Sequence, residues 1–208
     1  MHLLAVSKTC PGVSVRAAFD AGQRDFGENY VQEALAKITE LADLRADLRW
    51  HLIGPLQSNK AREVAAHFDW VHSVDRMKLA QRLSDLRPPE LAPLQVCLQV
   101  NVSGEDSKSG VTPEAALALA HGVAGLPRLK LRGLMAIPEP AGDLAAQRAP
   151  HRALRKLLEA MNAEGLGLDT LSIGMSADLE AAIAEGATWV RIGTAIFGSR
   201  PSKPDPAS

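Results

Sequence analysis

The stretch Leu3-Leu4-Ala5-Val6-Ser7-Lys8-Thr9 is an apolar run that ends at a lysine. Such a run, closed by Pro11 and Gly12, is typical of a buried strand followed by a loop. Lys8 therefore lies at the end of the strand. In the commoner arrangement its aliphatic stem packs and its ammonium reaches water. In the other, partial desolvation favours a neutral amine that forms a Schiff base with an aldehyde or ketone.

Beyond this first strand, short apolar stretches alternate with amphipathic helical patterns along the chain. The pattern predicts further strands at 25–27, 50–54, 70–74, 94–102, 129–137, 171–173 and 189–192, and helices at 13–21, 31–48, 59–68, 76–86, 113–125, 150–164 and 178–185. Buried strands that are separated by helices indicate parallel pairing, with both faces of the sheet covered.

Several helices carry recognisable end signals or breaks. We expect Asp75 and Thr112 to be N-caps and Gly165 to follow a helix C-terminus. Pro150 breaks a longer helical pattern, so the firm part of that helix begins there. In the helix at 31–48, Lys37 falls outside the apolar stripe, which places it on the solvent side.

Eight strand–helix units at this length predict an α/β fold, a single (β/α)8 TIM barrel. A doubly wound open sheet is the competing architecture, but its glycine-rich fingerprint is missing after the first strand, where Ser7-Lys8-Thr9 stands instead. We expect one domain at 1–200 and a disordered tail at 201–208.

The composition limits the classes of function. The chain has 208 residues, 23% charged and 46% hydrophobic, with a formal net charge of -1. Without a basic block, a nucleic-acid partner is not expected. No stretch reaches the roughly 18 apolar residues of a membrane-spanning helix, and no signal peptide is recognisable. We therefore expect a cytoplasmic protein with no membrane partner, and a monomer, because no apolar surface stripe exceeds what the barrel needs.

The cysteines and two histidines do not suggest a metal site. Cys10 and Cys97 have neither metal-ligand spacing nor the number that a disulfide framework requires. His51 and His72 lie in predicted strands, with no third ligand spaced to complete a site. We interpret both histidines as structural.

In a barrel of this kind the site forms at the C-terminal ends of the strands, and a phosphate often binds after strands seven and eight. Ser176 follows strand seven as a natural N-cap, and free amides at a helix start suit an anion. After strand eight, Gly193 allows close backbone approach and Thr194 supplies a hydroxyl. Strand eight also contains Arg191 near its end. These residues have simpler interpretations as well: Ser176 as a cap only, Gly193 as a turn residue and Arg191 as a salt-bridge partner.

Other polar or adaptable residues end the remaining strands. Asn29 follows strand two, Ser73 lies in strand four, Asn101 in strand five and Met135 in strand six. Each of them is compatible with a purely structural role at a strand end. Together with Lys8, they would line one mouth of the barrel.

Several longer stretches are specific enough to suggest a family. They are Ala5-Val6-Ser7-Lys8-Thr9, Phe26-Gly27-Glu28-Asn29-Tyr30, His51-Leu52-Ile53-Gly54-Pro55-Leu56-Gln57-Ser58-Asn59-Lys60, Asn101-Val102-Ser103, Ser107-Lys108-Ser109-Gly110, Arg132-Gly133-Leu134-Met135-Ala136-Ile137-Pro138, Leu171-Ser172-Ile173-Gly174-Met175-Ser176 and Val190-Arg191-Ile192-Gly193-Thr194-Ala195-Ile196-Phe197-Gly198. They span essentially the whole chain, in order. Through them the chain closely resembles the pyridoxal 5′-phosphate homeostasis proteins, the YggS/PROSC family.

The resemblance implies the barrel of fold-type III pyridoxal 5′-phosphate (PLP) proteins, like the N-terminal domain of alanine racemase. It implies that Lys8 holds PLP as a Schiff base and that Arg191 faces the pyridine nitrogen. The remaining residues that the resemblance assigns to the cofactor are Ser176, Gly193 and Thr194 at the phosphate, Asn29, Met135 and Ser172 near the ring, and Met175.

Two departures from the family pattern accompany the resemblance. Family members usually carry a further helix before the lysine-bearing strand, whereas Met1-His2 stands directly before it here. Either the start is misplaced, the chain is truncated, or this member lacks the helix, so we expect no such helix within 1–200. Racemases of this fold class have a second β domain and a tyrosine that acts as a base on the opposite face. We expect no second domain in this chain, and its one tyrosine is Tyr30.

Three functions are compatible with these residues. A permanently charged guanidinium at Arg191 disfavours protonation of the pyridine nitrogen, so the ring is a weak electron sink. We therefore expect a PLP-binding protein of intracellular PLP homeostasis that supplies apoenzymes, with no turnover and no catalytic residue of its own. The alternatives are a low-rate PLP-dependent amino-acid racemase and a phosphosugar aldolase that uses Lys8.

Overall fold

The computed structural model describes residues 1–103 and 109–198, which form a closed barrel of eight parallel strands. Each strand pairs with the next in the sequence, and β8 pairs with β1 to close the barrel. The strands are β1 His2–Val6, β2 Asp25–Glu28, β3 Arg49–Leu52, β4 Trp70–Val74, β5 Leu94–Gln99, β6 Leu129–Met135, β7 Thr170–Ser172 and β8 Trp189–Ile192. The predicted (β/α)8 barrel is confirmed.

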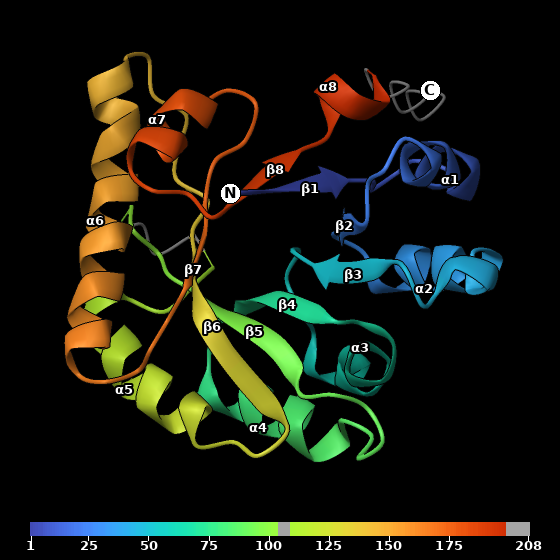
Figure 1. Cartoon of the computed structure of the whole chain (residues 1–208). Helices are drawn as coiled ribbons and strands as arrows, with labels where there is room; N and C mark the ends of the chain where they lie inside the picture. The colour runs from blue at the N-terminus through green and yellow to red at the C-terminus, as the bar shows by residue number, and fades with distance from the viewer. Residues whose placement is uncertain (104–108, 199–208) are drawn as a thin grey trace, which may run out of the picture.

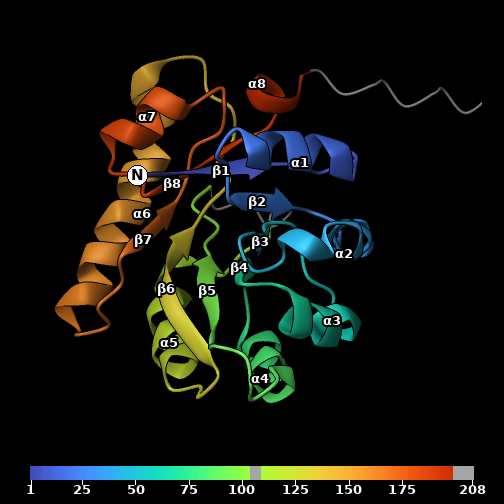
Figure 2. The same ribbon diagram turned by 45° about the vertical axis from the view of Figure 1, so that its right-hand side comes forward.

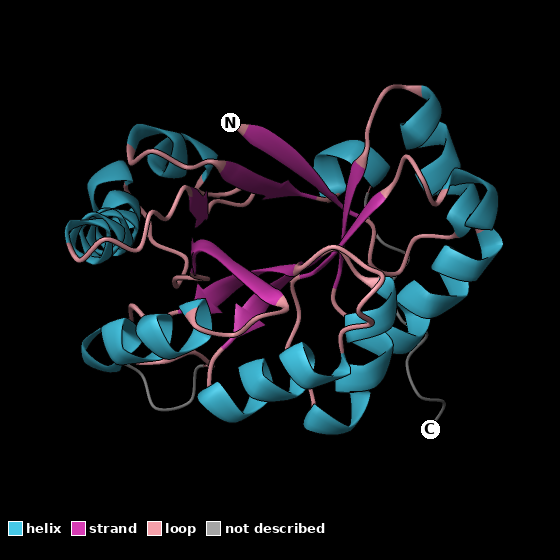
Figure 3. Ribbon diagram, turned by 60° about the horizontal axis from the view of Figure 1, so that its bottom comes forward, coloured by secondary structure: helices cyan, strands magenta, loops and turns pink. Residues whose placement is uncertain are grey.

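The helices lie outside the strands, as Figures 1 and 3 show. They are α1 Gly12–Asp20, α2 Val31–Glu40, α3 Ala61–His67, α4 Met77–Leu86, α5 Pro113–Ala124, α6 Leu144–Ala163, α7 Leu179–Ala184 and α8 Thr194–Phe197, with short 3-10 turns η1 Ala42–Leu44 and η2 Ser58–Lys60. Seen from the side in Figure 2, α6 runs along the barrel beside β6 and β7. Within the described residues, no helix is both long and apolar enough to cross a membrane.

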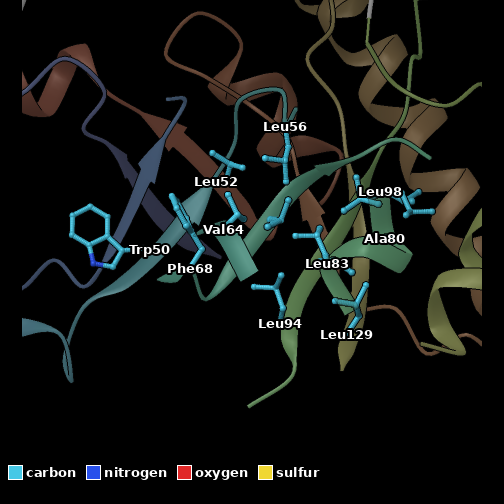
Figure 4. Close-up of a cluster of buried hydrophobic side chains, with 14 of the residues drawn as sticks. Trp50, Leu52, Leu56, Val64, Phe68, Ala80, Leu83, Leu94, Leu98 and Leu129 are labelled. Carbon is cyan, nitrogen blue, oxygen red and sulfur yellow. The ribbon is translucent and has the colours of Figure 1, made fainter. Parts of the chain in front are cut away.

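Alternation along each strand divides the apolar residues into two cores. In β1, Ala5 belongs to the large cluster between strands and helices, whereas Leu4 and Val6 belong to a smaller cluster inside the barrel. Figure 4 shows part of the outer cluster, where Leu94 and Leu129 lie close to Leu83 of α4. Alternation is the expected consequence of a strand whose successive side chains point to opposite faces.

The interior of the barrel is partly polar. Its apolar cluster includes Trp70 and Trp189, whose rings lie 5.7 Å apart. The ring of His51 stacks on Trp70, with 5.4 Å between centroids and 8° between planes. His72 also lies within the barrel, fully buried. Aliphatic side chains usually fill this space in such barrels, so the buried histidines require hydrogen-bond partners.

Some predicted helix ends are confirmed. The Thr112 hydroxyl accepts a hydrogen bond from the Ala115 amide at 3.4 Å, with proline at the first helical position. Gly165 follows α6 with a φ of 87°, a left-handed conformation that glycine adopts at little cost.

Other local predictions were wrong. Asp75 is not a cap, because α4 begins after Arg76 and has no side-chain cap. Pro150 does not break α6, which runs from Leu144 to Ala163 through the proline. Buried residues that follow the proline, among them His151 and Leu154, pack against the barrel and outweigh the missing hydrogen bond.

The helix predicted at 31–48 ends at Glu40 and is followed by the η1 turn. Lys37 is not on the solvent side but is 4% exposed, because its amine has acceptors near the end of β1. Residues 104–108 and the predicted tail at 201–208 lie outside the described residues.

Candidate functional site

A cavity of about 290 Å³ opens at the C-terminal ends of the strands. Its lining comprises most of the predicted site residues together with four apolar neighbours: Lys8, Asn29, Met175, Ser176, Arg191, Gly193 and Thr194, with Val6, Ile53, Ile137 and Ala177. The residues lie in β1 and β8 and in the segments that follow β1, β2, β3, β6, β7 and β8. A parallel barrel gathers these strand ends at one mouth, as the sequence predicts.

Met135 and Ser172 do not line this cavity. Both are fully buried. Met135 belongs to the apolar cluster inside the barrel, and the Ser172 hydroxyl lies 3.1 Å from Nη1 of Arg191. Both therefore lie beneath the cavity rather than in its wall.

The turn that carries Lys8 is held in an uncommon backbone conformation. Thr9 has a φ of 64°, a left-handed value that a β-branched residue rarely adopts. The Glu33 carboxylate accepts a hydrogen bond from the Thr9 amide. Strained residues of this kind persist where the surrounding contacts fix them, and they occur often at ligand sites.

A buried ionic cluster supports the same turn. The Lys37 ammonium donates to the Ser7 carbonyl at 2.6 Å, to Glu28 Oε1 at 2.8 Å and to Glu33 Oε1 at 2.7 Å. The Ser7 hydroxyl donates to Glu28 Oε1 at 2.5 Å. Burial raises the pKa of Glu28, while the charge and hydrogen bond of Lys37 act against that shift. All three protons of the Lys37 ammonium are thus used to hold the end of β1.

Backbone amides form an anion-compatible corner of the cavity. In the described part of the chain, no protein acceptor is recorded for the amides of Ser176, Ala177, Gly193 and Thr194. A Cβ on Gly193 would lie 3.2 Å from the Val6 carbonyl oxygen, so this approach of the backbone is close. Unpaired amides that converge on one cavity are suited to an anion such as phosphate.

Ser176 is not the helix cap that the sequence predicts. The residue before α7 is Asp178, and it makes no side-chain cap. Instead Asp178 Oδ1 accepts from the Met175 amide at 2.7 Å, and Oδ2 lies 2.8 Å from Nε2 of the buried His151. Burial raises the pKa of Asp178, but its hydrogen bonds and nearby positive charges lower the pKa overall. The Asp178–His151 pair therefore holds the loop that contains Ser176.

Arg191 enters the cavity from inside the barrel. It is 4% exposed. Its Nη1 donates to the Ser172 carbonyl at 2.7 Å and to the Ser172 hydroxyl at 3.1 Å, and its Nη2 donates to the Ala136 carbonyl at 2.9 Å. Burial lowers the pKa of Arg191 to about 10, so the guanidinium remains charged at neutral pH. These contacts use three of the five N–H groups of the side chain.

Hydrogen bonds continue from Ser172 through the barrel. Its hydroxyl lies 2.8 Å from Nδ1 of His72, and His72 Nε2 lies 3.0 Å from Nδ1 of His51. His51 Nε2 lies 3.1 Å from Asp25 Oδ1, and Arg49 donates to both Asp25 oxygens. We refer to Asp25, His51, His72 and Ser172 as the interior chain.

The pKa values of the interior chain follow from burial. Burial lowers the pKa of His51, although hydrogen bonding and the charge of Asp25 oppose the shift. Burial lowers the pKa of His72 well below the usual value, and the charges of His51 and Arg191 add to the effect. Burial raises the pKa of Asp25, but hydrogen bonds from Arg49 and His51 outweigh it and hold this pKa at about 2.

These contacts extend what the sequence predicts for the histidines. His51 and His72 hydrogen-bond to each other and to neighbouring polar side chains, in agreement with a structural role. Among the described residues, no group of three or more histidine, cysteine or acidic side chains is arranged to hold a metal ion. The sequence reasoning missed the interior chain and Lys37. The one available signal was period-two alternation, which places polar residues of β3, β4 and β7 inside the barrel.

The fold and site define a barrel of the alanine racemase N-terminal type, and the model of the family described as "Alanine racemase, N-terminal domain" matches residues 1–201. In agreement, alanine racemase of Clostridium difficile 630 has the same fold, with a TM-score of 0.76 at 12% identity over 98% of this chain and 53% of that chain. The chain belongs to the family of pyridoxal phosphate homeostasis proteins. The protein of that name from Pseudomonas aeruginosa is 68% identical over 95% of this chain and 84% of its own length.

A solved structure adds a ligand to the comparison. PipY of Synechococcus elongatus PCC7942, solved with PLP bound, superposes with a TM-score of 0.87 at 44% identity and covers 95% of this chain and 92% of that chain. The resemblance that the sequence predicts is therefore confirmed at the level of the family.

The Lys37 cluster provides a stability test. Lys37→Met leaves Glu28 buried without its counter-charge, which typically costs about 3 kcal/mol in free energy of unfolding. Lys60→Met is the matched control, because the Lys60–Glu63 pair is about one-third exposed, with side-chain exposures of 34% and 35%. This control should change stability by less than about 0.5 kcal/mol. Urea unfolding measures both values; equal losses in the two variants would contradict the assignment.

Stability should also fall with acidity in a way that depends on His72. Burial holds the folded-state pKa of His72 well below its ordinary value of 6.5, so unfolding takes up a proton as the pH falls below 6.5. The contribution of His72 to the free energy of unfolding is fully present above pH 6.5. It is lost as the pH falls below 6.5, by up to about 1.4 kcal/mol per pH unit. His72→Asn should remove this component between pH 7 and pH 5 in urea unfolding, while the exposed His121→Asn should retain it. Parallel curves for wild type and His72→Asn would show the prediction to be wrong.

Proposed function

We propose that the chain binds PLP, holds it as a Schiff base on Lys8, and supplies it to apo PLP-dependent enzymes without turnover of its own. The observation that carries this proposal is one cavity that is lined both by a lysine and by residues with unpaired backbone amides. PLP has an aldehyde, which reacts with a lysine amine, and a phosphate, which accepts hydrogen bonds from backbone amides. The names of the relatives and the PLP in PipY support the proposal.

Lys8 is the amine that suits the aldehyde. Lys8 lines the cavity, whereas Lys37 donates to three protein oxygens and does not line it. In the step that we propose, the neutral Nζ adds to the aldehyde carbon and a C=N bond forms with loss of one water. Hydrolysis reverses the step and returns the free amine and the aldehyde, so the cofactor can be released unchanged.

The other residues of the cavity suit the rest of the ligand. The amides near Ser176 and Gly193 would bind the phosphate, and the Thr194 hydroxyl would add a donor. Asn29 Oδ1 is buried with no partner among the described residues, so it is available to a ligand donor at the cavity wall. Arg191 keeps two N–H groups beyond its protein contacts and would face the pyridine nitrogen.

Two features favour binding over turnover. A charged donor at the ring nitrogen keeps that nitrogen unprotonated, which weakens the ring as an electron sink. Tyr30, the one tyrosine that could act as a second base in the racemase alternative, is 60% exposed and lines a neighbouring cavity rather than the one that contains Lys8. The family likeness to alanine racemase keeps a low racemase rate as the second candidate. Incorporation of solvent deuterium at the α-carbon of an amino acid would support that candidate.

A second cavity lies beside the first and gives room for exchange. It has a volume of about 600 Å³ and shares Asn29, Ile53, Ile137 and Met175 with the first. Water or an incoming amine could reach the Lys8 end through this space. The apoenzyme recipients, the monomeric state and the cytoplasmic location that the sequence predicts stay predictions.

The covalent link is tested by absorbance. The purified protein with PLP should show a visible band that borohydride abolishes, and digestion should place the reduced label on the peptide that contains Lys8. Lys8→Ala should show neither, because the amine is lost. Lys60→Ala is the control, since Lys60 lies at the neighbouring cavity. A label on Lys37, or an unchanged band in Lys8→Ala, would overturn the role of Lys8.

The phosphate corner is tested separately. Gly193→Ala brings a Cβ within 3.2 Å of the Val6 carbonyl oxygen, so either that carbonyl or the amide corner must give by a few tenths of an ångström. We expect PLP affinity to fall about tenfold, which corresponds to the loss of one good hydrogen bond. Pyridoxal, which lacks the phosphate, should bind the variant and the wild type equally in equilibrium absorbance titrations.

Gly142→Ala is the matched control, because a Cβ at Gly142 meets nothing within 4 Å. Its PLP affinity should equal that of the wild type. A parallel loss of PLP and pyridoxal in Gly193→Ala would mean that Gly193 supports the fold of the site rather than the phosphate.

A further inference from the structure

The geometry points to the interior chain as a positioning device for Arg191: hydrogen bonds run in one direction, from Arg191 through Ser172, His72 and His51 to Asp25, and fix the guanidinium at the cavity. The role of Arg191 toward a ligand rests on the proposed function. The direction of the chain does not rest on it, because it follows from the protein groups alone.

The two ends of the chain determine its direction. Arg191 has donors and no acceptor, so the Ser172 hydroxyl must accept from Nη1 at 3.1 Å. An ionised Asp25 carboxylate has acceptors and no donor, so His51 must donate to Oδ1 from Nε2 at 3.1 Å. Each group between these ends can give one proton and receive one.

The tautomers of both histidines follow from these end conditions. If His51 carries its proton on Nε2, its Nδ1 accepts from His72 Nε2 across 3.0 Å. His72 Nδ1 then accepts from the Ser172 hydroxyl across 2.8 Å. In this arrangement both imidazoles are neutral and every described contact of the chain pairs a donor with an acceptor. The hydrogen bond at one ring nitrogen thus sets the proton at the other.

A reversed chain requires a buried charge. If the Ser172 hydroxyl instead accepts from His72 Nδ1, His72 Nε2 needs a proton donor from His51. His51 must then donate from both nitrogens and become a cation, because Asp25 also requires a donor. His51 and His72 are fully buried. Burial disfavours the cationic form of His51, and the charge of Arg191 further disfavours a positive charge on His72.

The consequence for Arg191 is a fixed position. Its guanidinium donates to two carbonyls and to the Ser172 hydroxyl. The carbonyls belong to the backbone of the barrel and cannot be redirected by a side chain. The hydroxyl can rotate, unless His72 accepts its proton and turns its lone pairs toward Nη1. Through the Ser172 hydroxyl, the two histidines thereby orient the hydrogen bond that Arg191 donates to it. Burial strengthens such hydrogen bonds.

The direction is tested by nitrogen-15 NMR on histidine-labelled protein, without added PLP. His51→Asn and His72→Asn assign the two resonance sets among the six histidines. We expect both imidazoles to be neutral at pH 7 with the proton on Nε2. A proton on Nδ1 of either ring, or a cationic His51, would overturn the proposal. This measurement stands whether or not the chain binds PLP.

The positioning role is tested by PLP affinity and absorbance. Ser172→Ala and His72→Leu both interrupt the chain, and we expect PLP affinity to fall about tenfold with a changed visible spectrum. His72→Asn keeps an acceptor for the Ser172 hydroxyl and should restore most of the affinity. Cys97→Ala is the control, because Cys97 is a fully buried side chain of the same barrel interior that is not in the chain.

An Arg191→Met background separates positioning from packing. In that background Ser172→Ala should cause no further loss of PLP affinity, because the hydrogen bond from Arg191 to the Ser172 hydroxyl is already absent. An equal loss in both backgrounds, or a Ser172→Ala protein that binds PLP as Cys97→Ala does, would overturn the role. If the wild type fails to take up PLP while NMR gives the expected tautomers, the proposed function fails and the direction of the chain stands.

Discussion

A charged guanidinium inside a barrel of parallel strands is the constraint on which the interior depends. Arg191 is 4% exposed, and a buried charge is unfavourable unless its N–H groups have acceptors. In the described part of the chain those acceptors are two backbone carbonyls and the Ser172 hydroxyl. The hydroxyl needs its own acceptor, which is a ring nitrogen of His72. One buried charge thus requires polar residues in place of the aliphatic layers that usually fill such a barrel.

The candidate site therefore has two separate supports. On the β1 side, Lys37 holds the turn that carries Lys8 through Ser7 and Glu28. Inside the barrel, the interior chain contacts Arg191 of β8, the strand next to β1, through Ser172. Each support is buried and hydrogen-bonded, and the residues that they hold, Lys8 and Arg191, both line the cavity. A site whose functional side chains are fixed by a second set of contacts needs little rearrangement to receive a ligand.

The sequence predicts the barrel and the site more fully than it predicts these supports. The strands can be predicted because each is a short apolar run. Their C-terminal ends must meet at one mouth of the barrel, so Lys8 and Gly193 line the same cavity. The supports depend on contacts between distant residues, such as Ser172 with His72, one hundred positions apart. Local signals also placed Lys37 on the solvent side and a helix break at Pro150, and both predictions were wrong. In both cases long-range packing prevails over the local signal.

The same constraint bears on why such a site would store an aldehyde rather than activate a carbon acid. Burial lowers the pKa of Arg191 to about 10, which still leaves the guanidinium charged at neutral pH. Its contacts with the barrel fix it, so it cannot withdraw when a ligand arrives. A ring nitrogen that faces this donor accepts a hydrogen bond but gains no proton, and the ring then withdraws few electrons. In the proposed complex the barrel interior itself therefore favours reversible holding of the cofactor over chemistry at an amino-acid carbon.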